Sequence, residues 1–438
     1  MTRSLFASLL TCGLLLTPAA AQRPGAGGRP AAPEKPPALG QAATGRIVYS
    51  YENAGHWAMR AILLLSLGTD WHPDGLSIVR AALADKDDRL PPFAIETLLA
   101  ADDRVIAAMA TPETIAALID ALRSKNELVR TRLELLLHRL APAATCSGRT
   151  EWQRWWRDAQ DDWRPATWTP IEGAPTGGTS TQKVIERAFD LRDAGLQVVF
   201  VIDTTGSMQR AIDAARDAID DVSALLAGIT PKLELGLVHY KDFGDMGDGA
   251  RLLEPLTRDH KKVKERLGKL TASGGGDAPE RVEKGVEVAL DRRTKWDKDA
   301  NRMLLIVGDA PPHPETKAEL LRVVKQAYEH PFTTSKGPVT GGKSKELRPF
   351  ITSAIATSPF ALPTFKEIAA AGGGTAVSLN LGGPQRRGDK APPAAERRSA
   401  AEQIAEHVLL LSFDGTNEAQ LREFVRIFFT YRHAGAFD

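Results

Sequence analysis

The chain has 438 residues, a length that corresponds to about two or three domains. Its 56 basic and 55 acidic residues leave a formal net charge of +1, which gives no electrostatic case for nucleic acid as the partner. Hydrophobic residues make up 43% of the chain, which is enough for ordinary globular cores. Beyond the N-terminal segment, no stretch of sequence is apolar enough to span a bilayer.

The first 21 residues have the features of a signal peptide. Arg3 supplies a short basic region, an apolar stretch runs from Leu5 to Leu16, and small residues precede Gln22. We therefore expect export, to the periplasm or the exterior. A lipid anchor at Cys12 and retention of the segment as a membrane anchor are the alternatives. After cleavage Cys146 would be the one remaining cysteine, so no internal disulfide is expected.

Residues 22–45 are rich in Pro, Gly and Ala and have no periodicity, which predicts a linker. Residues 50–165 follow a helical pattern, in which apolar residues recur at helical spacing between Asn53 and Leu140. Several short helices with brief links resemble a degenerate HEAT-like array, which could bind proteins or act as a spacer.

Tryptophans gather at the end of the helical region. Trp152, Trp155 and Trp156 lie near one face of a predicted helix. They could form a platform for carbohydrate, but a packed cap on the helices is the favoured interpretation. Residues 166–190 then predict a second linker, because Pro, Gly and Thr dominate its first half.

The remaining chain alternates strands with helices. This order predicts an α/β fold, a Rossmann-like, doubly wound and mostly parallel sheet, preceded by the all-α domain. The expected strands are Gln197–Asp203, Leu233–Tyr240, Ala250–Leu256, Met303–Gly308, Pro349–Ala356 and Thr375–Leu379. The expected helices are Met208–Leu226, His260–Leu270, Pro279–Asp291, Lys317–Tyr328 and Pro363–Ala371. Residues 382–398 are expected to form a linker, and 399–438 two further helices.

Oxygen-bearing side chains follow two of the predicted buried strands. Asp203, Thr205 and Ser207 form a D-x-T-x-S pattern after the first strand, and Asp309 follows the fourth. Ligands of parallel sheets bind at the carboxyl ends of the strands. Carboxylate and hydroxyl oxygens suit hard cations, so this edge is the candidate metal site. The alternative is a purely structural role, in which Asp203 and Ser207 only cap the following helix.

Together with Ser273-Gly274-Gly275-Gly276-Asp277-Ala278-Pro279-Glu280, these motifs resemble a von Willebrand factor type A domain with its metal-ion-dependent adhesion site. The second loop and the segment Tyr240-Lys241-Asp242 are similar to the alpha-kinase and hemicentin-like subgroup. The resemblance spans residues 194–381. It implies that a divalent cation is held by Asp203, Thr205, Ser207, Asp277 and Asp309. Mg²⁺ is the favoured ion, with Mn²⁺ or Ca²⁺ as alternatives.

The resemblance implies a protein-binding module rather than an enzyme. The ion would accept an acidic residue of a protein partner in place of a water. Two alternatives remain: a regulatory or accessory subunit of an enzyme complex, and a scaffold that binds through the helical array with a structural metal.

Two further motifs are interpreted as chance matches. Residues 337–344 fit the P-loop pattern, but no strand leads into them, so no nucleotide site is expected. The tripeptide Arg387-Gly388-Asp389 lies in a Pro/Arg-rich linker and is interpreted as solvated charge. Asp242 and His313 lie near the predicted metal site and are interpreted as turn or capping residues.

Overall fold

The computed structural model describes residues 43–69, 71, 73–167, 179–244, 249–275, 279–332, 347–379, 400–413 and 418–437. The predicted signal peptide, the P-loop-like segment and the Arg-Gly-Asp tripeptide lie outside these residues. Within them, no helix is both long enough and apolar enough to span a membrane.

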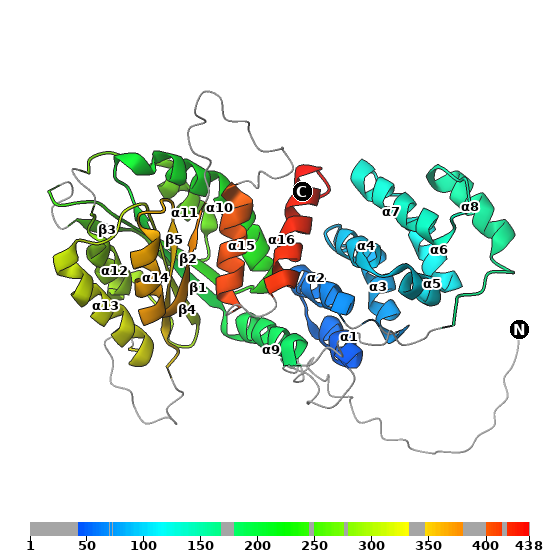
Figure 1. The fold of residues 1–438 in the computed structure, drawn as a ribbon, viewed down its shortest axis with the longest axis horizontal. Helices are drawn as coiled ribbons and strands as arrows, with labels where there is room; N and C mark the ends of the chain where they lie inside the picture. Colours follow the sequence, from blue (N-terminus) through cyan, green and yellow to red (C-terminus); the bar gives the residue numbers. More distant parts are fainter. Residues whose placement is uncertain are drawn as a thin grey trace, which may run out of the picture. The chain divides into compact units, whose positions relative to one another are not determined.

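The N-terminal part of the described chain is entirely helical, as predicted (Figure 1). Its helices are α1 (Ala43–Asn53), α2 (Trp57–Ser66), α3 (Leu76–Leu83), α4 (Leu90–Ala100), α5 (Asp103–Met109), α6 (Pro112–Ala121), α7 (Glu127–Leu140) and α8 (Gly148–Ala159), with short 3-10 turns η1 (Leu67–Thr69) and η2 (Pro73–Gly75). Helix α1 begins inside the stretch predicted as linker. It forms because Ile47 and Tyr51, four residues apart, bury one face of a helix.

The tryptophans form a packed cluster, as the favoured interpretation predicted. Trp152 is fully buried, and its ring contacts Trp155 edge-on at a centroid distance of 5.4 Å. Trp163 contacts both Trp155 and Trp156, at 6.0 and 5.8 Å. Trp168, also in this part of the sequence, lies outside the described residues. These rings therefore contribute to the core of the helical region rather than forming an open platform.

The second part of the chain contains a six-stranded sheet in the order β3-β2-β1-β4-β5-β6 (Figure 1). Its strands are β1 (Leu196–Asp203), β2 (Leu233–Tyr240), β3 (Ala250–Thr257), β4 (Asn301–Gly308), β5 (Phe350–Ala356) and β6 (Gly373–Ser378). Only the pairing of β2 with β3 is antiparallel; the other four pairings are parallel. The predicted mostly parallel sheet is confirmed.

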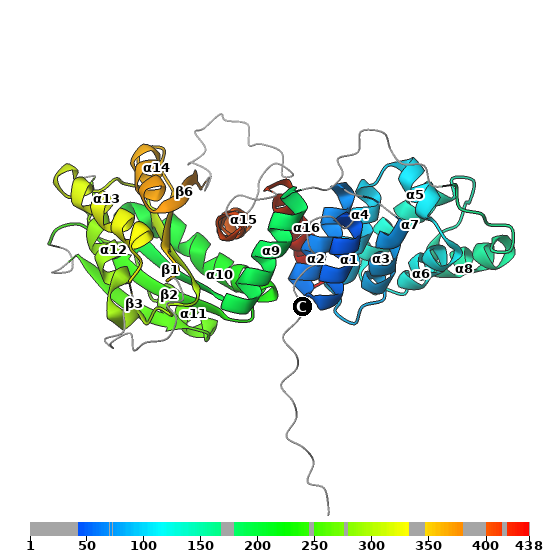
Figure 2. The ribbon, with the colours of Figure 1, turned by 90° about the horizontal axis from the view of Figure 1, so that it is seen from below.

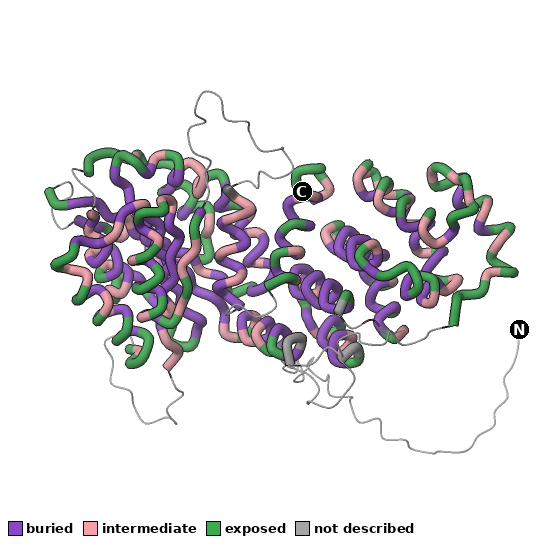
Figure 3. Tube along the Cα trace, viewed as in Figure 1, coloured by how far each residue is buried: buried purple, intermediate pink, exposed green. Residues whose placement is uncertain are grey.

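Helices cover both faces of this sheet, as a doubly wound fold requires. They are α10 (Gln209–Ile229), α11 (His260–Gly268), α12 (Val282–Leu290), α13 (Pro314–Glu329) and α14 (Leu362–Ala371). Alternate residues of β1 enter two separate hydrophobic clusters: Val198 and Phe200 join that of α10, whereas Val199 and Val201 join that of α12. Figure 3 shows that β1 and its neighbours are buried.

Three more helices connect the two parts. Helix α9 (Thr179–Ala194) occupies the second half of the stretch 166–190, so the prediction of a linker there is wrong from Thr179 onward. This helix forms because Val184, Ile185, Ala188 and Phe189 bury one face. Helix α15 (Ala400–Ser412) packs on α10, and α16 (Glu418–His433) packs on α2 and α4 (Figure 2).

Candidate metal centre

The first strand delivers Asp203 to the carboxyl edge of the sheet. The side chain is fully buried. Its Oδ1 accepts hydrogen bonds from the backbone nitrogen and the hydroxyl of Thr205, at 2.8 and 2.7 Å. Its Oδ2 has no hydrogen-bond partner in the described part of the chain. The N-cap residues of η3 (Gly206–Met208) and α10 are Thr205 and Met208, and neither side chain accepts a capping hydrogen bond. Asp203 accepts from Thr205, which precedes η3, so helix capping does not account for this motif.

The second loop packs directly on the first. Gly206 donates a backbone hydrogen bond of 3.0 Å to Gly274. Gly275 has a φ of +83°, and a Cβ there would lie 3.0 Å from the Cβ of Thr205. Glycine is therefore required both for the backbone conformation and for the close approach of the loops. Asp277, the predicted ligand from this loop, lies outside the described residues.

The third loop begins where β4 ends. Asp309 follows Gly308 directly and is half-buried beside Asp203, whose pKa its charge raises. A Cβ at Gly308 would lie 2.5 Å from the hydroxyl of Tyr240, so the β4 end must be glycine for β1, β2 and β4 to meet here. The structure thus brings together Asp203, Thr205 and Asp309. Ser207 is exposed on the same loop as Thr205.

Glu280 also belongs to this edge, and the sequence prediction missed it. Its backbone forms a bridge with Pro312 and donates 3.0 Å to the carbonyl of Pro311, which joins the second loop to the third. The side chain is 4% exposed, and Oε2 has no hydrogen-bond partner among the described residues. The sequence signal for it was the last position of the G-G-G-D-x-P-E loop.

Asp242 and His313 form a buried pair rather than acting as turn or capping residues. Nε2 of His313 lies 2.8 Å from Oδ1 of Asp242, and both residues are less than 10% exposed. His313 precedes α13 but makes no side-chain cap. The pair therefore links the loop after β2 to the loop after β4.

Burial and neighbouring carboxylates raise the pKa values of Asp203 and Glu280. Burial, followed by the charge of Asp309, raises the pKa of Asp203 to about 7, against hydrogen bonds from Thr205 that lower it. Burial and the charges of Asp203 and Asp242 raise the pKa of Glu280 to about 8. Such shifts indicate negative charge that the surrounding side chains do not neutralise.

The carboxylate and hydroxyl oxygens at this edge are chemically suited to a hard cation. Two buried carboxylate oxygens, on Asp203 of the first loop and Glu280 of the second, have no hydrogen-bond partner among the described residues. Thr205 of the first loop and Asp309 of the third lie at the same edge and supply further oxygen atoms. Within the described residues, no group of three or more His, Cys, Asp or Glu side chains is arranged to hold an ion alone. The predicted set differs from such a group because it includes two hydroxyls and Asp277.

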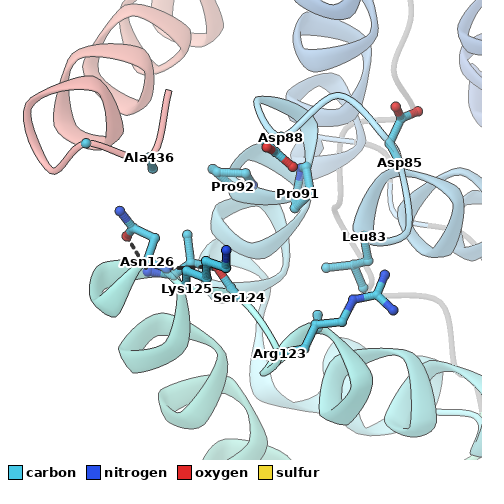
Figure 4. Close-up of a pocket in the computed structure, with 13 residues that line it drawn as sticks. Leu83, Asp85, Asp88, Pro91, Pro92, Arg123, Ser124, Lys125, Asn126 and Ala436 are labelled. Atoms are coloured by element: carbon cyan, nitrogen blue, oxygen red, sulfur yellow. Dashed lines mark hydrogen bonds between the residues drawn. The ribbon is translucent and has the colours of Figure 1, made fainter. Parts of the chain in front are cut away.

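A cavity lies in the helical region. A cavity of about 580 Å³ opens between the turn before α4, the turn between α6 and α7, and the C-terminal residues (Figure 4). Asn126, at its wall, donates 2.9 Å to the carbonyl of Ala434. The walls carry both charges, from Asp85, Asp88, Arg123 and Lys125.

Residues 197–380 match the family model of the von Willebrand factor A domain. The chain therefore contains a von Willebrand factor A domain behind a helical region, as the three loop motifs predicted. Among solved structures, the crystal structure of the SpRpn10 VWA domain is similar at 15% identity with a TM-score of 0.31, covering 42% of this chain and 88% of that chain. No curated protein matches this chain in sequence. Domains of this type generally mediate interactions between proteins.

Proposed function

We propose that this is an exported binding protein in which a divalent cation links the von Willebrand factor A domain to an acidic group of a protein partner. Mg²⁺ is the favoured cation. Asp203, Thr205, Ser207, Asp277 and Asp309 would hold the ion. When bound, the ion supplies positive charge and an exchangeable water position that a partner carboxylate can take. The site binds and does not turn over a substrate.

The observation that carries the proposal is the uncompensated charge of Asp203 and Glu280. Burying a carboxylate without a cation to neutralise it costs several kcal/mol, and such groups are usually paired or bind metals. The cationic side chains of the neighbouring loops are engaged elsewhere. Lys241 donates to Ser273, whereas Arg281 pairs with Glu283 at 3.1 Å. A divalent cation would supply the missing charge.

Calorimetric titration of the metal-free protein with Mg²⁺ and Mn²⁺ tests the metal. We expect binding to be lost in Asp203→Ala and Asp309→Ala. Asp217→Ala, an exposed aspartate on α10, is the matched control and should bind as wild type does. Equal binding in all four proteins would contradict the site. Turnover that requires Asp309 would contradict the binding role and favour an enzyme subunit.

Export rests on residues 1–21 alone. Expression of the full chain in a bacterial host, followed by fractionation and N-terminal mass analysis, should give a mature chain that begins at Gln22 outside the cytoplasm. A chain that retains Met1 in the cytoplasm would contradict export without bearing on the metal.

The cavity of the helical region supports a second candidate, a scaffold that binds through its helices. Its lining includes Asp88 and Lys125, on opposite walls. In that case Lys125→Glu would abolish binding of a partner that Asp203→Ala leaves bound. The reverse result would place the partner at the metal centre.

A further inference from the structure

Two phenylalanines are unusually exposed near the candidate metal centre. Phe243 and Phe360 expose 53% and 60% of their surface. Among the described residues, these are the two most exposed large hydrophobic side chains. Single exposed apolar residues are common, but an exposed phenylalanine forgoes part of the stabilisation that burying its side chain would give. Two of them on one edge therefore call for a reason.

The sheet order places the two rings on either side of the metal centre. Phe243 follows β2 and Phe360 follows β5. Between these strands lie β1 and β4, which end at Asp203 and Gly308. Neighbouring strands are about 4.8 Å apart, so the ends of β2 and β5 are about 14 Å apart, with the carboxylates between them.

The ring of Phe243 is held in place although it is exposed. The guanidinium carbon of Arg281 lies 4.4 Å from its centroid, and the ring of His313 lies at 4.8 Å. His313 is itself fixed by Asp242, and Arg281 by Glu283. An aromatic side chain that is already ordered loses little entropy when a partner packs on it.

Phe360 lies in the short turn between β5 and α14. Its backbone nitrogen donates 3.1 Å to the hydroxyl of Ser358, which fixes this turn. The following helix starts at Leu362 with proline in its first turn, so the backbone leaving Phe360 is also constrained. Both rings are thus presented by ordered loops.

We propose that Phe243 and Phe360 form an apolar rim that selects the partner's sequence around its acidic residue. In an extended chain, residues two apart point to the same side and lie about 6.6–6.8 Å apart. Residues two before and two after a central acidic residue are therefore about 13–14 Å apart, close to the spacing of the two strand ends from which the loops of Phe243 and Phe360 extend. The partner segment has the pattern apolar-x-acidic-x-apolar. This inference rests on the proposed metal-dependent binding.

Fluorescence anisotropy with three labelled, glycine-flanked peptides tests the rim. The probes contain Leu-Gly-Asp-Gly-Leu, Ser-Gly-Asp-Gly-Ser and Leu-Gly-Asn-Gly-Leu, each measured in Mg²⁺ and in EDTA. We expect each leucine that is buried to strengthen the binding of the Leu-Gly-Asp-Gly-Leu probe about ten-fold relative to the Ser-Gly-Asp-Gly-Ser probe. The Leu-Gly-Asn-Gly-Leu probe should not bind. Phe243→Ala and Phe360→Ala should each remove about one such factor while leaving Mg²⁺ affinity unchanged.

Phe332→Ala is the matched control, because Phe332 is 37% exposed and packs on Phe350 at the start of β5, away from the carboxyl edge. Thermal melting verifies that each variant is folded. Equal affinity for the first two probes, or wild-type selectivity in both rim variants, would overturn the rim and leave the metal site intact. Equal binding of the aspartate and asparagine probes, or binding that persists in EDTA, would instead overturn the proposed function.

Discussion

The hydroxyl of Tyr431 donates a buried hydrogen bond of 2.8 Å to Oε1 of Glu96, which joins α16 to α4. Arg132, on α7, lies 3.1 Å from the same carboxylate oxygen. Beside this contact, Trp57 of α2 stacks on Phe428 of α16 at 5.8 Å. The last helix of the chain is therefore part of the core of the N-terminal helical region.

Tyr431→Phe should lower the free energy of unfolding by about 1–2 kcal/mol, because it removes one hydrogen bond to a buried carboxylate and preserves the ring packing. Urea unfolding measures the change. Tyr328→Phe is the matched control, since Tyr328 is 39% exposed. If both variants unfold at the wild-type midpoint, the contact with Glu96 contributes nothing to stability.

Gly228→Ala should destabilise the junction between α10 and α2. A Cβ at this position would lie 2.7 Å from the indole of Trp57 and 2.8 Å from Cβ of Ala58. Overpacking of this kind costs about 1–3 kcal/mol, whereas the gain in helix propensity is at most about 1 kcal/mol. A net loss is expected, measured by urea unfolding.

Gly268→Ala is the control for this substitution, because a Cβ there meets nothing within 4 Å. It lies at the end of α11 and should be neutral or slightly stabilising. A Gly228→Ala protein as stable as Gly268→Ala would show that the two helices separate at little cost.

The sequence was informative where burial imposed a simple pattern. Strand β1 is buried on both faces, so its apolar run is continuous from Val198 to Ile202, and the polar residue that ends this run, Asp203, marks the end of the strand. The same reasoning located the end of β4 at Gly308 and hence Asp309. Since these strands are parallel neighbours, their carboxyl ends had to meet.

The sequence was less informative where tertiary packing decides. Helix α9 follows a Pro/Gly/Thr segment, and its apolar face packs on α1 and α2, which lie far earlier in the sequence, as well as on α10. Glu280 reads as the first-turn residue of a helix, and only the pairing of its backbone with Pro312 places it among the carboxylates. The hydrogen bond between Asp242 and His313 joins residues 71 positions apart, which no local pattern reveals.

Gly275→Ala should weaken Mg²⁺ binding. Its φ of +83° disfavours a side chain, and the added Cβ would press on Thr205 at 3.0 Å, displacing the first loop. Gly244→Ala separates the two effects, because Gly244 has a φ of +84° with nothing within 4 Å. Both variants should lose about 1–2 kcal/mol of stability from backbone strain, whereas calorimetry should show reduced metal affinity in Gly275→Ala alone.

The stability of the metal-free protein should fall as the pH rises. The pKa values of Asp203 and Glu280 are raised to about 7 and about 8, above the ordinary values of 3.8 and 4.5 that hold in the unfolded chain. Between about pH 4 and about pH 8 the folded state therefore keeps protons that the unfolded state has released. The free energy of unfolding decreases through this window, and below it the two states bind equal numbers of protons at these groups.

Asp203→Asn removes one of the two carboxyl groups that make the stability depend on pH. The urea midpoint of this variant in EDTA should therefore depend less steeply on pH than that of the wild type. Asp217→Asn, on the exposed surface of α10, should keep the wild-type slope. Saturating Mg²⁺ should stabilise the wild type most at high pH, because the ion binds the deprotonated carboxylates in competition with protons. Parallel profiles for wild type and Asp203→Asn would mean that a group of the chain itself already neutralises Asp203. In that case the charge of Asp203 would not require a bound cation.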